Sequence, residues 1–200
     1  MEQIIRILLP AYFVIYFGIA FVAKSLIVAR RIGQNPLVLP KDDSAYGLIG
    51  YYFKITLILM FIYTVFYALI PAHYEIFLVL QILDVLYLKY IGIGLLVLAL
   101  IWTIIAQTDM KDSWRIGIDT QTKTELITTG LFKYSRNPIF LGMLTALLGL
   151  FLLTPNALTL IFLLVGYILI QIQIRLEEEF LAKEHGDNYL SYMLKVRRFI

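Results

Sequence analysis

Five apolar segments, each close to the length of a membrane span, occupy most of this 200-residue chain. A helix needs about 20 mostly apolar residues to cross a bilayer. Hydrophobic residues make up 60% of the chain and charged residues only 16%, whereas roughly a quarter of a soluble domain is charged. The sequence therefore predicts an all-α, polytopic integral membrane protein. The five spans are expected at about 4–29, 51–70, 90–106, 139–153 and 157–174.

The last two spans form a hairpin that is broken only by Thr154-Pro155-Asn156. Each is slightly short, so we expect it to extend by a turn into its polar flank. Segment 75–88 is ambiguous because Asp84 interrupts it and it is too short to cross a bilayer. It is either an interfacial helix or an early extension of the third span. We expect a single domain over 1–200, with the first three spans within 1–107.

Lysine and arginine residues follow the first, third and fifth spans, whereas the segment after the fourth span has none. Loops rich in Lys and Arg stay in the cytoplasm. This pattern predicts an outside N-terminus, a cytoplasmic C-terminus, and a cytoplasmic location for the long loop at 108–138. The basic residues are Arg30, Arg31 and Lys41, then Lys111, Arg115, Lys123, Lys133 and Arg136, and finally Lys183, Lys195, Arg197 and Arg198.

Cysteine is absent, and the two histidines, His73 and His185, are far apart in the sequence. Disulfides, thiolate nucleophiles and Cys-ligated metals are therefore excluded. We expect no metal site.

The first polar cluster is Tyr134-Ser135-Arg136-Asn137-Pro138, immediately before the fourth span. Proline is tolerated in the first turn of a helix, so Pro138 is expected to start one. Asn137 or Ser135 could cap that helix. Its free N–H groups and Arg136 would together bind an anion. The alternative is a basic anchor at the membrane surface with an ordinary proline start.

The second polar cluster, Arg175 with Glu177, Glu178 and Glu179, follows directly from the fifth span. Charges at this position are costly, so they point to function. Helical spacing predicts that Arg175 lies over Glu178 and Glu179, while Glu177 points elsewhere. A guanidinium can grip a carboxylate and a carboxylate can accept from an ammonium, so the face could bind a zwitterion. The alternative is an intrahelical ion pair worth only tenths of a kcal/mol.

Taken together, these clusters resemble the isoprenylcysteine carboxyl methyltransferase family in its short prokaryotic form, which is related to the phospholipid N-methyltransferases. The first motif is met by Gly130, Phe132 or Tyr134, Arg136, Asn137, Pro138, Phe140 and Gly142, and the second by Arg175, Glu178, Glu179, Leu181, Gly186, Tyr189 and Tyr192. The final Val196-Arg197-Arg198-Phe199-Ile200 also fits. Asn137 and Phe140 depart from the family's usual His and Tyr, so these two positions supply neither an imidazolium nor a phenol.

The resemblance implies that 108–200 is the cofactor-binding catalytic region of an S-adenosylmethionine-dependent methyltransferase. By resemblance, Arg175 holds the acceptor as a catalytic residue. Glu178, the second catalytic candidate, joins Glu179 in binding the ammonium or ribose of the cofactor, and Arg136 with the helix start at Asn137 and Pro138 holds the cofactor's carboxylate. Leu131, Tyr134, Phe140 and Leu141 complete the expected cofactor site, with the apolar residues against the adenine.

The implied acceptor is a lipophilic molecule that enters from the bilayer, with an isoprenoid-like or prenylcysteine-like carboxylate. A phospholipid N-methyltransferase is one alternative. Another is an NADPH-dependent reductase, because steroid 5-alpha-reductases have a similar C-terminal region. A non-catalytic membrane scaffold is a third. Gly142, Gly149 and Gly166 are interpreted first as helix-packing residues and second as room for a lateral lipid gate.

Trp114 allows two interpretations. Indole rings favour the headgroup zone of a membrane. This tryptophan and its polar neighbours, Asp109 to Gly117, could instead form one wall of a cytoplasmic ligand site.

Overall fold

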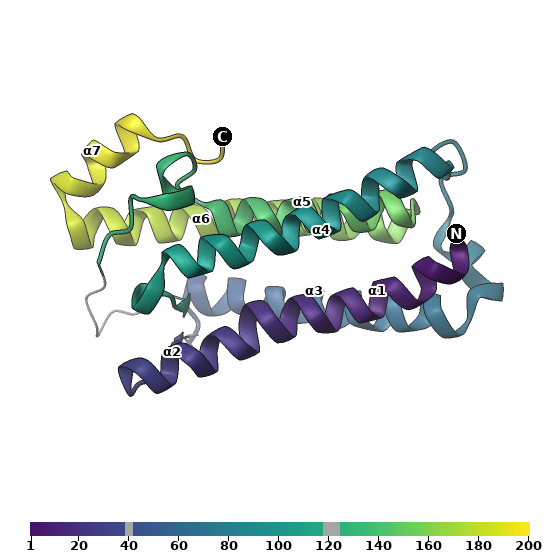
Figure 1. The fold of residues 1–200 in the computed structure, drawn as a ribbon, viewed down its shortest axis with the longest axis horizontal. Helices are drawn as coiled ribbons and strands as arrows, with labels where there is room; N and C mark the ends of the chain where they lie inside the picture. The colour runs from purple at the N-terminus through teal and green to yellow at the C-terminus, as the bar shows by residue number, and fades with distance from the viewer. Residues whose placement is uncertain (39–41, 118–124) are drawn as a thin grey trace.

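The computed structural model describes residues 1–38, 42–117 and 125–200. Two of the basic residues used to orient the chain, Lys41 and Lys123, lie outside the described residues. The described part is a bundle of long helices that run roughly along one axis (Figure 1). The predicted all-α membrane architecture is confirmed, because four helical segments are long and apolar enough to cross a bilayer.

The first spanning segment, Glu2–Ile32, consists of α1 (Glu2–Phe17), the π-helical η1 (Gly18–Ala23) and α2 (Lys24–Ile32). The next two spans are α3 (Ala45–Leu69) and α4 (Leu86–Asp109). After the loop come the shorter apolar helix α5 (Pro138–Leu153), the long α6 (Ala157–His185) and α7 (Asp187–Lys195). The fifth predicted span extends well past 174, whereas α5 has only 16 residues.

Short elements connect these helices. They are the 3₁₀-helices η2 (Pro71–Phe77), η3 (Lys111–Ser113) and η4 (Gly130–Lys133), and the strands β1 (Leu37–Val38) and β2 (Ile116–Gly117). The two strands pair in parallel, with Leu37 opposite Ile116. This pairing joins the loop that follows α2 to the loop that follows α4.

Segment 75–88 is neither of the two predicted alternatives over its whole length. Its first residues complete η2, and its last three begin α4. Between them, Val79 forms an antiparallel bridge with Asn156 in the turn between α5 and α6. The backbone N–H of Leu80 also donates to Pro155 at 2.8 Å. The segment is irregular here because its polar backbone groups pair with that turn.

A buried polar network holds the same end of the bundle together. The side-chain amide of Asn156 donates to the hydroxyl of Tyr63 on α3 at 2.8 Å and to that of Tyr74 on η2 at 3.3 Å. Its oxygen accepts from the backbone N–H of Thr159 at 3.0 Å, which caps α6. Asn156 is fully buried, and these bonds satisfy its polar atoms inside the protein.

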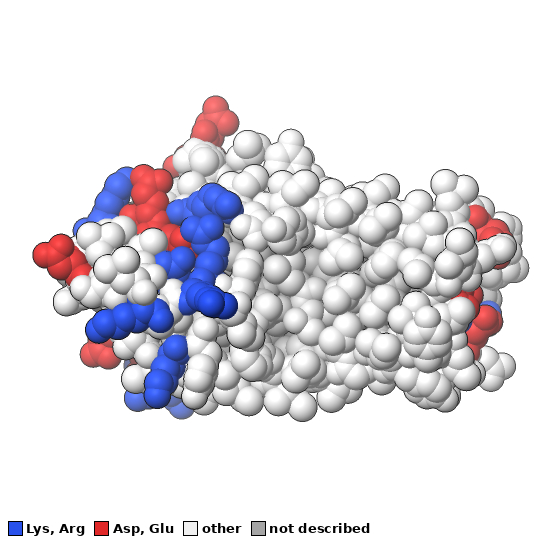
Figure 2. Space-filling view, turned by 90° about the horizontal axis from the view of Figure 1, so that it is seen from above, with Lys and Arg blue, Asp and Glu red and all other residues white. Residues whose placement is uncertain are grey.

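Charged side chains gather at the opposite end of the molecule (Figure 2). This basic end is where α2, α4 and α6 finish and where α3 and α5 begin. It carries, among others, Arg30, Arg31, Lys133, Lys183 and Lys195. The molecule is therefore asymmetric along its long axis, with a broad apolar belt between two unequal polar ends.

Small residues allow α4 and α5 to pack closely. A Cβ atom added at Gly92 would lie 2.9 Å from the carbonyl oxygen of Gly149, and one added at Gly149 would lie 3.0 Å from that of Gly92. A Cβ atom at Gly142 would overlap the hydroxyl of Thr103 on α4, and one at Gly166 would overlap Leu147. These contacts favour the helix-packing interpretation of Gly142, Gly149 and Gly166.

We predict that Gly92→Ala destabilises the protein by about 1–3 kcal/mol, because the added methyl group meets a backbone atom that cannot move aside cheaply. Gly94→Ala is the matched control, since it lies two residues away on α4 with nothing within 4 Å of the added atom. Unfolding of both variants in detergent micelles would measure the difference. Equal stabilities would contradict the close α4–α5 packing.

Candidate active site

The two polar clusters found in the sequence meet at the basic end of the bundle. Pro138 starts α5, as predicted. Arg136 and Asn137 precede it, and Glu178 lies on the part of α6 that extends beyond the apolar span. The helical hairpin α5–α6 brings these residues together, because one helix begins where the other leaves the apolar belt.

The chain before α5 is fixed to the end of α4. The backbone N–H of Leu131 donates to the carboxylate of Asp109 at 2.8 Å. Gly130 has a φ of +61°, and a Cβ atom there would overlap that carboxylate. A glycine is therefore needed at this turn both for its backbone conformation and for the space it leaves. Trp102 supports the same region by donating from its indole N–H to the carbonyl of Pro138 at 2.9 Å.

The C-terminal segment folds back over this region. Tyr192 on α7 donates its hydroxyl to the carbonyl of Phe132 at 2.6 Å. Burial raises the pKa of Tyr192 to about 12, so the hydroxyl remains a donor at neutral pH. After α7, the backbone carbonyl of Arg197 accepts from the N–H of Arg136 at 3.0 Å. The terminal residues thereby lie against the start of α5.

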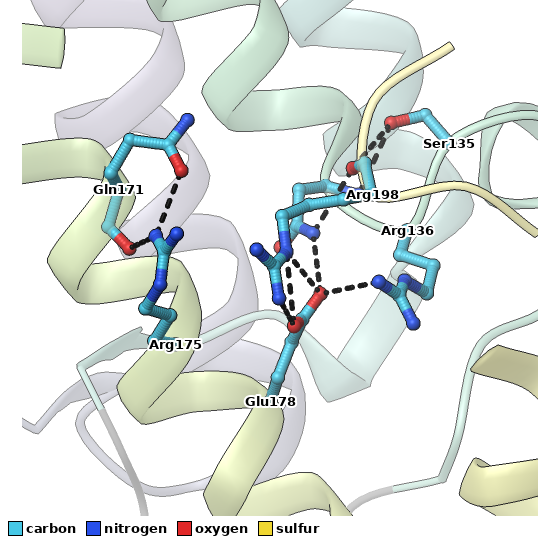
Figure 3. A network of polar contacts seen from close by, with 7 residues as sticks. Ser135, Arg136, Gln171, Arg175, Glu178 and Arg198 are labelled. Carbon is cyan, nitrogen blue, oxygen red and sulfur yellow. Dashed lines mark hydrogen bonds and ion pairs between the residues drawn. The ribbon is translucent and has the colours of Figure 1, made fainter.

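The carboxylate of Glu178 is the centre of the site (Figure 3). It is 6% exposed and lies between two guanidinium groups. Arg198 approaches to 2.6 Å and forms further bonds at 3.1 and 3.2 Å. Arg136 approaches to 3.2 Å, and the amide of Asn137 donates to the same carboxylate at 3.3 Å. We refer to Arg136, Asn137, Glu178 and Arg198 as the Glu178 centre.

Two cations and one anion leave the Glu178 centre with a net positive charge. The hydrogen bonds to Glu178 raise the pKa of Arg198, so its guanidinium stays charged. The side chain of Arg136 is 9% exposed, and its Nε–H has no partner among the described residues. An unpaired buried N–H group on a cation is costly. The centre is therefore suited to an additional anionic group such as a carboxylate or a phosphate.

Asn137 occupies the N-cap position of α5 but makes no capping bond with its side chain. Its amide instead donates to Glu178 and, at 3.2 Å, to the backbone carbonyl of Arg198. The hydroxyl of Ser135 accepts from the N–H of Asn137 at 3.2 Å. The side chain of Asn137 therefore joins α5 to the C-terminal segment. This role requires a hydrogen-bond donor but no titratable group.

Arg175 lies outside this network. It donates to the carbonyl of Gln171 at 2.6 Å and to the side-chain oxygen of Gln171 at 2.8 Å (Figure 3). Among the described residues, no ion pair joins it to Glu178 or Glu179, so the structure does not support the alternative interpretation of this cluster as an intrahelical ion pair. Arg175 is nevertheless exposed one turn from Glu178.

The three adjacent glutamates have different surroundings. Only Glu178 points into the centre. Glu179 is exposed and pairs with Lys183 on the next turn at 2.6 Å. Glu177 accepts from the amide of Gln173 at 2.8 Å and is half-buried. The helical register therefore directs Glu178 into the centre, while Glu177 and Glu179 have other partners.

The residues expected against the adenine lie around the start of α5 but are not equivalent. Phe140 packs against the buried cluster of Leu147, Ile170 and Ile174. Leu131 and Leu141 are half-buried, whereas Tyr134 is 63% exposed. Trp114, for which two locations were considered, is 2% exposed. Tyr134 is therefore free to contact a bound molecule, whereas Trp114 is part of the packed interior.

Arg198 is the residue of the centre that sequence reasoning did not assign. It was seen only as part of a basic C-terminal run that fits the family pattern. It lies 20 residues after Glu178, and α7 must turn back before the two can meet. The available signal was the run Val196-Arg197-Arg198-Phe199-Ile200, in which charged and apolar residues are mixed at the end of the chain.

We predict that Glu178→Gln loosens the C-terminal segment, because two buried or half-buried guanidinium groups lose their shared anion. Hydrogen bonds to charged groups contribute about 1.5–3 kcal/mol, so hydrogen exchange at 189–200 should accelerate by roughly tenfold or more. Glu179→Gln, which affects only an exposed pair, is the control. Unchanged exchange in Glu178→Gln would mean that the segment is held by its backbone bonds alone.

The sequence profile of the phospholipid methyltransferase family (PEMT) matches residues 88–188, half of the chain. No curated protein and no solved structure matches the chain. The matched region includes Arg136, Asn137 and Glu178, while Arg198 lies beyond it. The match confirms the predicted relationship to phospholipid methyltransferases and favours that class over the reductase and scaffold alternatives. The chain is a membrane methyltransferase that belongs to the phospholipid methyltransferase family.

Proposed function

We propose that this protein transfers a methyl group from S-adenosylmethionine to a lipophilic acceptor at the basic end of the bundle. The observation that carries the proposal is the Glu178 centre, in which a buried carboxylate and two guanidinium groups meet at the membrane exit of α6. In a chain of the phospholipid methyltransferase family, such a centre fits a zwitterionic amino-acid group better than a neutral ligand.

The donors and acceptors of the centre suit the amino-acid end of S-adenosylmethionine. The unpaired Nε–H of Arg136 would bind its carboxylate, beside the start of α5. Glu178 would hold the two guanidinium groups in place and accept from the ammonium, and Glu179 would accept from the ribose. Leu131, Phe140 and Leu141 would contact the adenine, and Tyr134 has an exposed ring that could cover it.

When bound, S-adenosylmethionine supplies a methyl group on a sulfonium sulfur, from which an acceptor takes it by in-line displacement. The protein then contributes mainly by positioning the acceptor and excluding water. Arg175, exposed next to the centre, is our candidate for holding an anionic acceptor. A carboxylate acceptor is already ionised and needs no general base.

Two acceptor classes remain, each supported by a different observation. A carboxylate of an isoprenoid-like or prenylcysteine-like lipid fits the local excess of guanidinium groups. A phospholipid amine fits the name of the family. An ammonium acceptor would be repelled by the guanidinium groups of Arg136 and Arg198 beside Glu178. The charge distribution therefore favours the carboxylate.

We propose that the basic end faces the cytoplasm, with the N-terminus outside. The gathering of Lys and Arg at that end supports this orientation. The cofactor would then enter from water beneath the 108–138 loop, and the lipid acceptor from the bilayer.

We predict that S-adenosylhomocysteine binds the purified protein saturably in calorimetric titration, whereas NADPH does not. Glu178→Gln should weaken this binding by roughly tenfold or more, because a charge-assisted bond contributes about 1.5–3 kcal/mol. Lys195→Gln, which changes a charge on α7 outside the centre, serves as a control. Binding of NADPH without S-adenosylhomocysteine would overturn the proposal.

We further predict that the labelled methyl group of S-adenosylmethionine appears in membrane lipid as a carboxyl methyl ester. Mild alkali releases methanol from such an ester but leaves an N-methyl group intact, so lipid extraction followed by alkaline treatment separates the two acceptor classes. Alkali-stable label would identify a phospholipid amine instead. Arg175→Ala should reduce turnover more than it reduces S-adenosylhomocysteine affinity, if Arg175 holds the acceptor.

A further inference from the structure

An apolar cavity of about 70 Å³ lies inside the bundle, away from the Glu178 centre. Its wall is formed by α1 and α3 on one side and by α5 and α6 on the other, with Leu96 contributed by α4. The lining includes, from α1, α3, α5 and α6 respectively, Phe13, Thr56, Ala146 and Ile170. None of the described residues that line the cavity is charged.

Three polar side chains in the cavity wall, those of Tyr12, Tyr16 and Thr64, already form hydrogen bonds. The hydroxyl of Tyr12 donates to the carbonyl of Leu96 at 2.9 Å, and that of Tyr16 is 2.9 Å from the hydroxyl of Thr103. Thr64 donates to the backbone of its own helix at 2.8 Å. An apolar cavity does not hold ordered water, and an unfilled one loses dispersion contacts. Inside a bilayer, the matching occupant is a hydrocarbon chain.

The cavity is connected to the Glu178 centre by apolar contacts. Leu147 and Ile170 line the cavity and also form a buried cluster with Ile174, against which Phe140 and Phe199 pack. Phe140 is in the first turn of α5, and Phe199 follows Arg198 directly.

The two sites are also separated by a distance that a lipid chain can span. Ile170 and Glu178 lie eight residues apart on α6, which corresponds to about 12 Å along the helix axis. A charged headgroup at Arg175, beside the centre, and a chain in the cavity therefore match one amphiphilic molecule.

We propose that this cavity holds the hydrocarbon chain of the methyl acceptor, a lipid with an acyl or isoprenoid chain whose anionic headgroup lies at Arg175, beside the Glu178 centre. The inference rests on the proposed function and adds to it the part of the protein that selects the acceptor by its chain. The N-terminal helices α1 and α3 thereby contribute to the substrate site, although they lie outside the region matched by the family profile.

Photo-labelling tests the occupant directly. The probe is a long-chain fatty acid with a diazirine near its methyl end, added to the purified protein in excess detergent. We expect cross-links on the segments of α1, α3 and α5 that line the cavity, and we expect excess unlabelled oleate to remove them. Cross-links confined to the outer, lipid-facing surface would overturn the proposal.

Cavity-filling variants then test whether the occupant is the acceptor. Ala146→Phe and Thr56→Phe fill the cavity from opposite walls, and Leu148→Phe and Ile58→Phe are controls on the lipid-facing surfaces of the same helices. The filled variants should lose cavity labelling and transfer roughly tenfold less labelled methyl into total membrane lipid. Their S-adenosylhomocysteine affinity should be unchanged, which also reports that they are folded.

The remaining outcomes separate the two proposals. Lost labelling with unchanged methyl transfer would mean that the cavity holds a structural lipid, and would overturn the inference. Equal effects of the filling variants and the surface controls would overturn it too. If the wild-type protein binds no S-adenosylhomocysteine, the proposed function fails, whereas photo-labelling still reports whether the cavity binds a chain.

Discussion

The arrangement of the C-terminal half depends on one buried carboxylate. Glu178 lies where an apolar helix leaves the membrane region, and an isolated ion there would be costly. Two guanidinium groups and an amide offset that cost by bonding to both of its oxygens. Since Arg136 precedes α5 and Arg198 follows α7, this single ion joins three segments that are distant in sequence. The tail, the loop and the helical hairpin thereby become one site.

The other end of the bundle is held by neutral polar groups. Asn156 connects the α5–α6 turn to α3 and to η2 through bonds that carry no charge. The two ends differ in their ability to attract an ionic ligand. Neutral bonds fix a structure without attracting an ionic ligand, whereas a centre with surplus positive charge can accept one. Between the ends, apolar packing leaves a cavity where α1 and α3 face α5 and α6.

Much of the fold could be predicted because membrane spans are set by composition and length. The start of α5 at Pro138 and the importance of Arg136 and Glu178 followed from local spacing and from the cost of charge near hydrocarbon. The partners could not be predicted. Arg175 and Glu178 share a helix face, yet Arg175 bonds to Gln171 while Arg198 reaches Glu178 from the end of the chain. The irregular conformation of segment 75–88 was not predicted either, because it depends on the tertiary pairing of Val79 with Asn156.

The cavity and the Glu178 centre impose opposite requirements on one substrate. The region around the centre, where Arg175 is exposed, favours a charged headgroup, whereas no described residue that lines the cavity is charged and the cavity favours hydrocarbon. A water-soluble acid would satisfy only the first, and a neutral lipid only the second. An amphiphile satisfies both at once, with its headgroup fixed by its own chain about 12 Å away. Such a chain lowers the entropy that the headgroup must lose at the reacting position. Selectivity and positioning would then come from the same contacts, made in part by α1 and α3, which carry no residue of the Glu178 centre.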